Sequence, residues 1–208
     1  ALVQVAQHLM AVVDRFVARD VILTPGQFET PVGLVIVGGE GDDVYDGSAA
    51  LIVDLGGNDR YNNAAGVSSS EFPVSVCIDV AGDDVYAGWQ GMGVLGIGVL
   101  VDLAGDDRYE GSGLGAGIAG VGIVNDWEGD EQYQTIIGGQ GFGIYGVGML
   151  VDGGGSDRYA GGLLIQGAAG PGGGGVLLDV RGNDVYDAGG VYRDFREGGA
   201  FFQSMSQG

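Results

Sequence analysis

The chain has 208 residues, including 46 glycines, 28 acidic residues and 8 arginines but no lysine, and its formal net charge is −20. A hydrophobic fraction of 45% excludes a disordered low-complexity chain. The negative charge argues against nucleic acid and anionic membrane surfaces as partners and favours cations. Because no stretch approaches 18 consecutive apolar residues, we expect no membrane insertion.

Apolar residues at the N-terminus recur at helical spacing, from Leu2 to Phe16. The sequence predicts a helix over residues 1–22, and two prolines in residues 24–31 end the pattern. The only histidine, His8, lies in this segment, where a packing or surface role is favoured over catalysis. We expect the helix to cap the repeats that follow, because solenoid ends expose unpaired strand edges.

Residues 23–208 form the second unit, in which one motif occurs seven times. The motif is aliphatic-x-aliphatic-Asp-x-x-Gly-x-Asp-x-Tyr, and its tyrosines are 23 to 27 residues apart after a short first interval. In copy one Gly38 replaces the first Asp, and in copy five Glu131 replaces the second. Copies one to seven span residues 36–45, 52–61, 77–86, 100–109, 124–133, 150–159 and 177–186.

The residues before each first Asp alternate and are rich in β-branched side chains, which is typical of a strand. A unit of this length is too short for a βαβ crossover and lacks helical periodicity. The repeat therefore predicts an all-β fold, a parallel β-solenoid of the β-helix or β-roll kind with about seven coils. Glycine-rich arms such as residues 90–99 would close each coil.

Both faces of these strands are apolar, as in residues 97–103, where one row of aliphatic side chains ends in Leu103 and the other in Asp102. Strands of this kind are usually buried on both sides. One face would fill the solenoid, and the other would need a cover from the chain itself or from a second copy. We therefore expect self-association into a homo-oligomer or a filament.

Stacking the copies in register places their acids in two columns. Carboxylates about 5 Å apart repel by roughly 1 kcal/mol per pair in water and by more near a protein surface, so each column requires neutralisation. The first acids are Asp54, Asp79, Asp102, Asp126, Asp152 and Asp179. The second acids are Asp43, Asp59, Asp84, Asp107, Glu131, Asp157 and Asp184.

Three groups can neutralise these columns. Arg60, Arg108 and Arg158 follow the second acid, but valine holds that place in other copies. Backbone amides of the Gly-x-Asp turn can donate to the first acid of the same coil. Metal is the third, because carboxylate and carbonyl oxygens without His or Cys favour Ca²⁺. All thirteen acids are therefore candidate calcium ligands, with backbone amides as the open alternative.

The stretch GGEGDDVYD, residues 38–46, resembles the nonapeptide of the RTX, or hemolysin-type, calcium-binding repeats. The resemblance implies a parallel β-roll in which turn carbonyls and the Asp of adjacent turns hold Ca²⁺. Only this stretch matches in full, and the period is near 24 residues rather than nine. The metal-binding Asp of the family corresponds to Asp43 and, through the shared Gly-x-Asp, to Asp59, Asp84, Asp107, Asp157 and Asp184.

Two other features favour packing roles. The only cysteine, Cys77, lies in an aliphatic run and is expected to be a small buried hydrophobe, so no intramolecular disulfide forms. The motif tyrosines are expected to form an aromatic stack. They are Tyr45, Tyr61, Tyr86, Tyr109, Tyr133, Tyr159 and Tyr186.

Together these observations favour a non-enzymatic, calcium-stabilised solenoid at the cell surface or outside the cell, with a structural, adhesive or filament-forming role. The alternative is a polysaccharide lyase or hydrolase that uses paired acids such as Asp83 and Asp84 or Asp106 and Asp107. A catalytic pair should be singular, whereas these pairs recur. An ice-binding surface would need a regular ladder of threonine, and the chain has three threonines.

Overall fold

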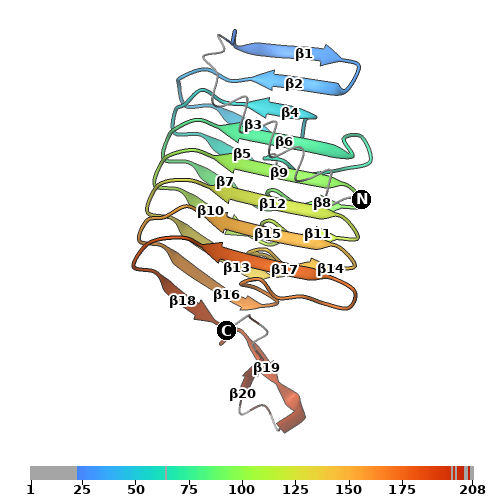
Figure 1. Cartoon of the computed structure of the whole chain (residues 1–208), viewed down its shortest axis with the longest axis vertical. Helices are drawn as coiled ribbons and strands as arrows, with labels where there is room; N and C mark the ends of the chain where they lie inside the picture. Colours follow the sequence, from blue (N-terminus) through green and yellow to red (C-terminus); the bar gives the residue numbers. More distant parts are fainter. Residues whose placement is uncertain (1–22, 64, 198, 200, 204–205, 207–208) are drawn as a thin grey trace.

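The fold is all-β, a parallel β-solenoid of about five turns (Figure 1). We analysed a computed structural model, which describes residues 23–63, 65–197, 199, 201–203 and 206. The predicted capping helix at residues 1–22 lies outside the described residues, and within them there is no α-helix. In that same part of the chain, no helix has the length and apolar composition needed to cross a bilayer.

Three sheets run along the solenoid axis. The strands of the eight-stranded sheet, in spatial order, are β1 (Gly26–Thr30), β2 (Gly33–Val37), β4 (Leu51–Val53), β6 (Val74–Asp79), β9 (Ile97–Asp102), β12 (Val121–Asp126), β15 (Val147–Asp152) and β17 (Gly174–Asp179). All neighbours are parallel except β1, which runs antiparallel to β2. The strands before the first acids, predicted from their alternation, are confirmed.

The seven-stranded sheet carries the tyrosines and is parallel throughout. It contains β3 (Val44–Asp46), β5 (Arg60–Asn62), β7 (Val85–Ala87), β10 (Arg108–Gly111), β13 (Gln132–Ile137), β16 (Arg158–Leu163) and β18 (Val185–Ala188). The glycine-rich arms supply the third sheet, β8 (Gly93–Val94), β11 (Gly117–Ile118) and β14 (Gly143–Ile144). Beyond β18 follow β19 (Tyr192–Asp194), a 3-10 turn (Phe195–Glu197) and β20 (Phe201–Gln203), where β19 and β20 form an antiparallel hairpin.

The prediction of about seven coils is wrong. Tyr45 and Tyr61 are direct partners in β3 and β5, and the short segment between them contains no strand of the third sheet. Within the described residues the third sheet has only three strands, so the outer motif copies belong to turns that lack this side. The seven copies therefore make about five turns.

Equivalent positions of the motif lie side by side, as expected from stacking in register. Leu100 pairs with Cys77 on one side and Val124 on the other, and Tyr109 lies between Tyr86 and Tyr133. Neighbouring tyrosine rings stack with centroids 4.7–4.8 Å apart and interplanar angles of 6–15°. The predicted aromatic stack is confirmed.

The solenoid interior is one core cluster built from two facing sheets. Ile52, Cys77, Leu100 and Leu150 of the eight-stranded sheet pack with the tyrosines of the opposite sheet. Cys77 is fully buried, as predicted, and burial raises the pKa of its thiol. The interior face is therefore the one that carries the acids, a choice that the sequence left open.

The opposite face of the same strands forms a second cluster. Val53, Val76, Val99, Val101 and Ile123 are buried there, so the strands are apolar and buried on both sides, as predicted.

The turn between the two acids requires glycine because successive turns are in contact. A Cβ built on Gly105 would lie 1.7 Å from the carbonyl oxygen of Gly82, and one on Gly129 would lie 1.7 Å from that of Gly105. Both glycines also have positive φ angles, of 151° and 157°. Glycine is therefore required at this position of Gly-x-Asp wherever a copy packs against the backbone of the preceding copy.

The substitution Gly105→Ala is expected to lower the free energy of unfolding by at least about 2 kcal/mol, because backbone must move to accommodate the new methyl group. Gly41→Ala is the matched control: it occupies the same motif position in copy one, where a Cβ meets nothing within 4 Å. Urea denaturation of both variants measures the difference. Equal loss of stability in the two variants would contradict the packing of turn on turn.

Candidate metal centre

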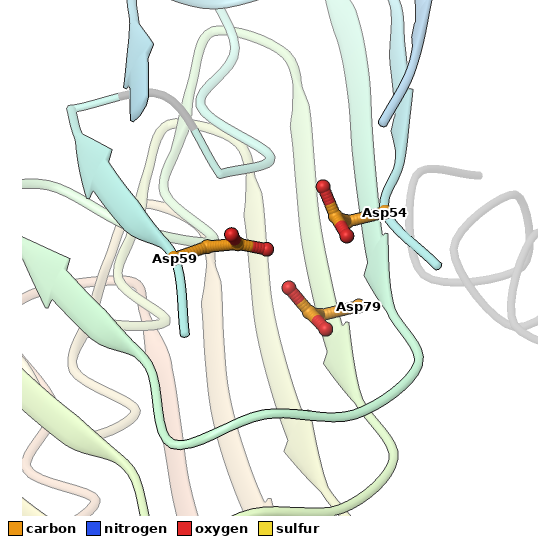
Figure 2. A group of neighbouring side chains, drawn as sticks. All are labelled: Asp54, Asp59 and Asp79. Carbon is orange, nitrogen blue, oxygen red and sulfur yellow. The ribbon is translucent and has the colours of Figure 1, made fainter. Parts of the chain in front are cut away.

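The two columns of acids face one another inside the solenoid. In copies three to seven the first acid is the last residue of its strand in the eight-stranded sheet, and Asp54 directly follows β4. The second acid comes just before the strand of the seven-stranded sheet. Because the intervening turn reverses the chain, both carboxyl groups point inward, as Figure 2 shows for Asp54, Asp59 and Asp79.

Most of these acids are almost completely buried. The first acids Asp54, Asp79, Asp102, Asp126 and Asp152 have at most 1% of their surface exposed, and the second acids Asp59, Asp84, Asp107, Glu131 and Asp157 at most 2%. Asp179 and Asp184, in the last copy, are partly exposed. Ionised groups at such depth are costly unless they are paired, hydrogen-bonded or bound to metal.

Four of the first acids, Asp54, Asp79, Asp102 and Asp152, are hydrogen-bonded at both oxygens. In Asp102, Oδ1 accepts the amide of Ala104 at 3.1 Å, and Oδ2 accepts the hydroxyl of Tyr86 at 2.5 Å. Amides two residues ahead bind Asp54, Asp79 and Asp152 in the same way. A backbone amide of the same coil thus satisfies one oxygen of these four acids, as the alternative predicted, but the donor is the residue just before the Gly-x-Asp turn.

The tyrosines do more than pack. From copy one to copy five, each tyrosine hydroxyl donates to the first acid of the following copy: Tyr45 to Asp54, Tyr61 to Asp79, Tyr86 to Asp102, Tyr109 to Asp126 and Tyr133 to Asp152. The sequence signal was the constant spacing of Tyr after the second acid. The polar role was missed because the bond joins different copies.

The second acids form a ladder between copies. Oδ1 of Asp84 accepts the amide of Asp59 at 2.6 Å, and Oδ1 of Asp107 accepts that of Asp84 at 2.7 Å. The second oxygens of Asp59, Asp107 and Asp157 are buried without any hydrogen-bond partner. Unpartnered buried oxygens are rare in folded proteins, and each requires an explanation.

The structure gathers the acids into five groups whose ligand oxygens lie within 4.8 Å of one another. Neighbouring groups share members, so Asp79 and Asp102 each belong to two groups. The groups are Asp54, Asp59 and Asp79; Asp79, Asp84 and Asp102; Asp102, Asp107 and Asp126; Glu131, Asp152 and Asp157; and Asp157, Asp179 and Asp184.

Of the thirteen predicted ligands, Asp43 is the one that joins none of these groups. It is exposed, and its copy has Gly38 where the first acid should be. A Cβ at Gly38 would lie 2.0 Å from Oδ2 of Asp54 and 2.1 Å from the hydroxyl oxygen of Tyr45, so no acid fits there. Copy one therefore lacks the partner that would make Asp43 part of a group.

Copy five departs from the ladder because Glu131 is longer than aspartate. Both oxygens of Glu131 and Oδ1 of Asp126 are buried without a partner. Glu131 belongs to a group with Asp152 and Asp157 of the next copy, whereas Asp126 belongs to the group before it. The chain of shared acids is thus interrupted between Asp126 and Glu131.

Burial dominates the ionisation of these groups. Loss of solvent, reinforced by neighbouring carboxylates, raises the pKa of Asp59 to about 7 and that of Asp79 to about 8. It raises the pKa values of Asp107 and Glu131 to about 11. Without a counter-charge, the folded protein would hold Asp79, Asp107 and Glu131 largely protonated at neutral pH, and Asp59 about half protonated.

Arginine does not supply that counter-charge. Within the described residues, the ion pairs join Arg108 to Glu110, Arg158 to Asp187 and Arg196 to Asp194. None of these three partners belongs to the five groups.

The donor set fits a hard cation. It consists of oxygen only, four of the five groups contain an unpartnered buried oxygen, and each group combines carboxylates from two copies. The repeated clusters can therefore hold metal ions.

Two further sets of polar residues have structural roles that the sequence did not predict. Asn58, Asp83 and Asp106 form an exposed ladder in which each side chain accepts the amide of the next copy. Gln90 and Gln140 are buried, and their amide groups donate to backbone carbonyls, including those of Tyr61 and Tyr133. Their regular spacing was the available signal.

Comparison of the chain with protein-family models, curated proteins and solved structures finds no match in any of the three. The fold and the acidic clusters therefore rest on the sequence and the structure of this chain alone.

In EDTA, the melting temperature is expected to fall by roughly 10 °C or more as the pH rises from about 4 to about 8. The folded-state pKa values of Asp59, Asp79 and Asp84 are raised to about 7, 8 and 7, above those of the unfolded chain. The stability they contribute is therefore fully present below about pH 4, and it is lost as the pH rises through these values. Thermal melts followed by circular dichroism measure this.

Most proteins with buried ion pairs behave in the opposite way and lose stability in acid. A melting temperature in EDTA that rises steadily between pH 4 and pH 8 would contradict the ionisation behaviour described above.

Proposed function

We propose that this chain is a non-enzymatic, calcium-stabilised solenoid that serves as an extracellular or cell-surface structural element. The observation that carries the proposal is the set of buried, unpartnered carboxylate oxygens that recurs between successive motif copies. A cation placed in each group binds oxygens from two copies at once. It would therefore act as a cross-link along the axis, in a chain that cannot form an intramolecular disulfide.

The charges support this assignment. The five groups contain twelve different carboxylates, and five divalent cations would leave only two negative charges uncompensated. Monovalent ions would leave more than half of the charge in place. Shared acids such as Asp79 and Asp102 would bridge neighbouring ions, and a bridging carboxylate offsets the repulsion between two cations.

Calcium suits these groups better than magnesium or a transition metal. The ligands are buried carboxylates from two copies, and a buried interior leaves little room for the waters that Mg²⁺ retains. The partial RTX resemblance of residues 38–46 agrees with calcium, although Asp43, within that stretch, joins no group. Calcium abundance outside cells supports the location.

A structural role is favoured over catalysis. In the two acid pairs considered for a glycan-active enzyme, Asp83 and Asp106 are exposed, whereas Asp84 and Asp107 have 1% of their surface exposed. The members of a pair thus point to opposite sides of the backbone and would not meet at one substrate bond. The same arrangement recurs along the solenoid, as expected of a scaffold.

Self-association stays a prediction, and the surface that supports it is the outward face of the last strand, β17, rather than that of the central strands. The buried outward row of Val99 and Val101 offers no surface to a second copy. On the same face, Val176 and Leu178 of β17 are 38% and 50% exposed, and Val180, directly after β17, is 56% exposed. These residues form the apolar surface on which a homo-oligomer or filament could be built.

The folded protein is expected to bind about five Ca²⁺ per chain, one for each group, and to melt at a higher temperature in calcium than in EDTA. Elemental analysis after dialysis against calcium and removal of free ion gives the stoichiometry, and thermal melts at pH 7.5 give the stabilisation. No retained calcium and identical melting temperatures would refute the proposal.

Asp102→Asn is expected to reduce bound calcium by about two ions, because Asp102 belongs to two groups, while the amide oxygen still accepts the Ala104 amide. Asp106→Asn is the matched control. Asp106 is exposed and lies four residues after Asp102 in the same turn. Copy two naturally has asparagine, Asn58, at this motif position. Elemental analysis of both variants measures the loss. Equal calcium content in the two variants would place the ions elsewhere.

A further inference from the structure

The end of the solenoid formed by β17 and β18 is open. Within the described residues, β17 pairs only with β15 and β18 only with β16, so each strand has one free edge. Tyr186 stacks on Tyr159 with ring centroids 4.7 Å apart, but it remains 49% exposed, whereas Tyr159 is fully buried. Figure 1 shows that β18 is the last strand on its side before the chain leaves towards β19.

The hydrogen bonds at this end are displaced from the pattern of the preceding copies. Elsewhere each tyrosine donates to the first acid of the following copy, so Tyr159 should donate to Asp179. Instead Tyr186 donates to Asp179 of its own copy at 2.7 Å, and the buried hydroxyl of Tyr159 has no partner. Because Tyr186 takes the place of Tyr159 as the donor to Asp179, the Tyr159 hydroxyl is left inside the core without a hydrogen-bond partner.

The ladder of second acids also stops here. The amide of Asp157 donates to Oδ1 of Asp184 at 3.0 Å, but in the described part of the chain no acceptor is found for the amide of Asp184. The three N-terminal groups each take their third member from the following copy, and Asp179 and Asp184 lack that neighbour as well.

The opposite end is different. There β1 runs antiparallel along β2 and covers the edge of the eight-stranded sheet. Tyr45, the first ring of the stack, is 8% exposed, and Gly38 leaves no place for another acid beside it. At this end the eight-stranded sheet is thus covered by β1, while β3 of the seven-stranded sheet pairs only with β5 within the described residues. At the other end both sheets have a free edge.

We infer that the open end, formed by β17, β18 and Tyr186, is a docking surface for a further copy of the motif, added in parallel with an acidic side chain opposite Tyr186. The partner follows from continuity, since every interface between copies has the same register. The new acid would accept the Tyr186 hydroxyl, which frees Asp179 to accept Tyr159. The strands of the added copy would pair with the free edges of β17 and β18, and the tyrosine of that copy would extend the tyrosine stack.

The inference can be tested by extending the chain. Ser206 bridges in parallel to Ile165, and Gln207-Gly208 repeats the dipeptide Gln166-Gly167, so residues 168–188 can be appended after Gly208 as an eighth copy. Nitration of tyrosine followed by mass spectrometry then reports which rings are accessible. Tyr109, fully buried, and Tyr145, 68% exposed, provide the two reference levels in every sample.

In the original chain Tyr186 is expected to be nitrated. In the extended chain its nitration is expected to fall to the level of Tyr109, the appended tyrosine becomes the reactive one, and the melting temperature rises. The same extension with Asp179→Ala made in the appended segment only keeps the tyrosine stacking but removes the side-chain oxygen that would accept the Tyr186 hydroxyl. It should therefore protect Tyr186 with a smaller rise in melting temperature.

Continued nitration of Tyr186 in the extended chain, with an unchanged melting temperature, would overturn the inference. Equal melting temperatures for the extensions with Asp and with Ala at this position would refute the role of the acid. Protection of Tyr186 in the original chain that grows with protein concentration, together with a dimer mass in light scattering, would show that a second copy covers this end instead. The measurements do not depend on calcium and can be made in EDTA.

Discussion

The structure depends on burying carboxylates in the core of a repeating fold. Ten of the motif acids have at most 2% of their surface exposed, and parallel stacking repeats them at the 4.7–4.8 Å separation of the tyrosine rings. Charges at that separation cannot accumulate in a medium of low dielectric constant. Every other feature of the motif is explained by the need to hold these acids while limiting their repulsion.

The motif residues divide this task. The amide two residues after the first acid and the tyrosine of the preceding copy satisfy the first carboxylate, as in Asp102 with Ala104 and Tyr86. The amide of the preceding copy satisfies one oxygen of the second carboxylate, as in Asp84 with Asp59. Glycine lets the turns approach closely enough for these bonds. These bonds leave one unpartnered oxygen on the second acid in several copies, and a cation between copies can bind it.

Much of this arrangement could be predicted from the sequence. The spacing of Tyr86 and Tyr109, and the alternation that ends in Asp102, were sufficient for the parallel solenoid, the register and the two columns of acids. The alternation could not decide which face is interior, because Val99 and Leu100 are equally apolar. The number of turns was overestimated because a motif copy is not a full turn, and Asp43 was included because the effect of Gly38 requires coordinates. The bond from each tyrosine to the following copy joins residues that no local pattern connects.

The central claim is that cations between motif copies neutralise the buried acids. The most direct test is an anomalous difference map from crystals grown in calcium, collected at a wavelength where calcium scatters anomalously and sulfur positions serve as reference. The account predicts a row of peaks along the axis, with one peak enclosed by Asp102, Asp107 and Asp126. A map with no peaks between these carboxylates, and with neighbouring acid oxygens close enough to share a proton, would show that protons and not metal ions balance the charge.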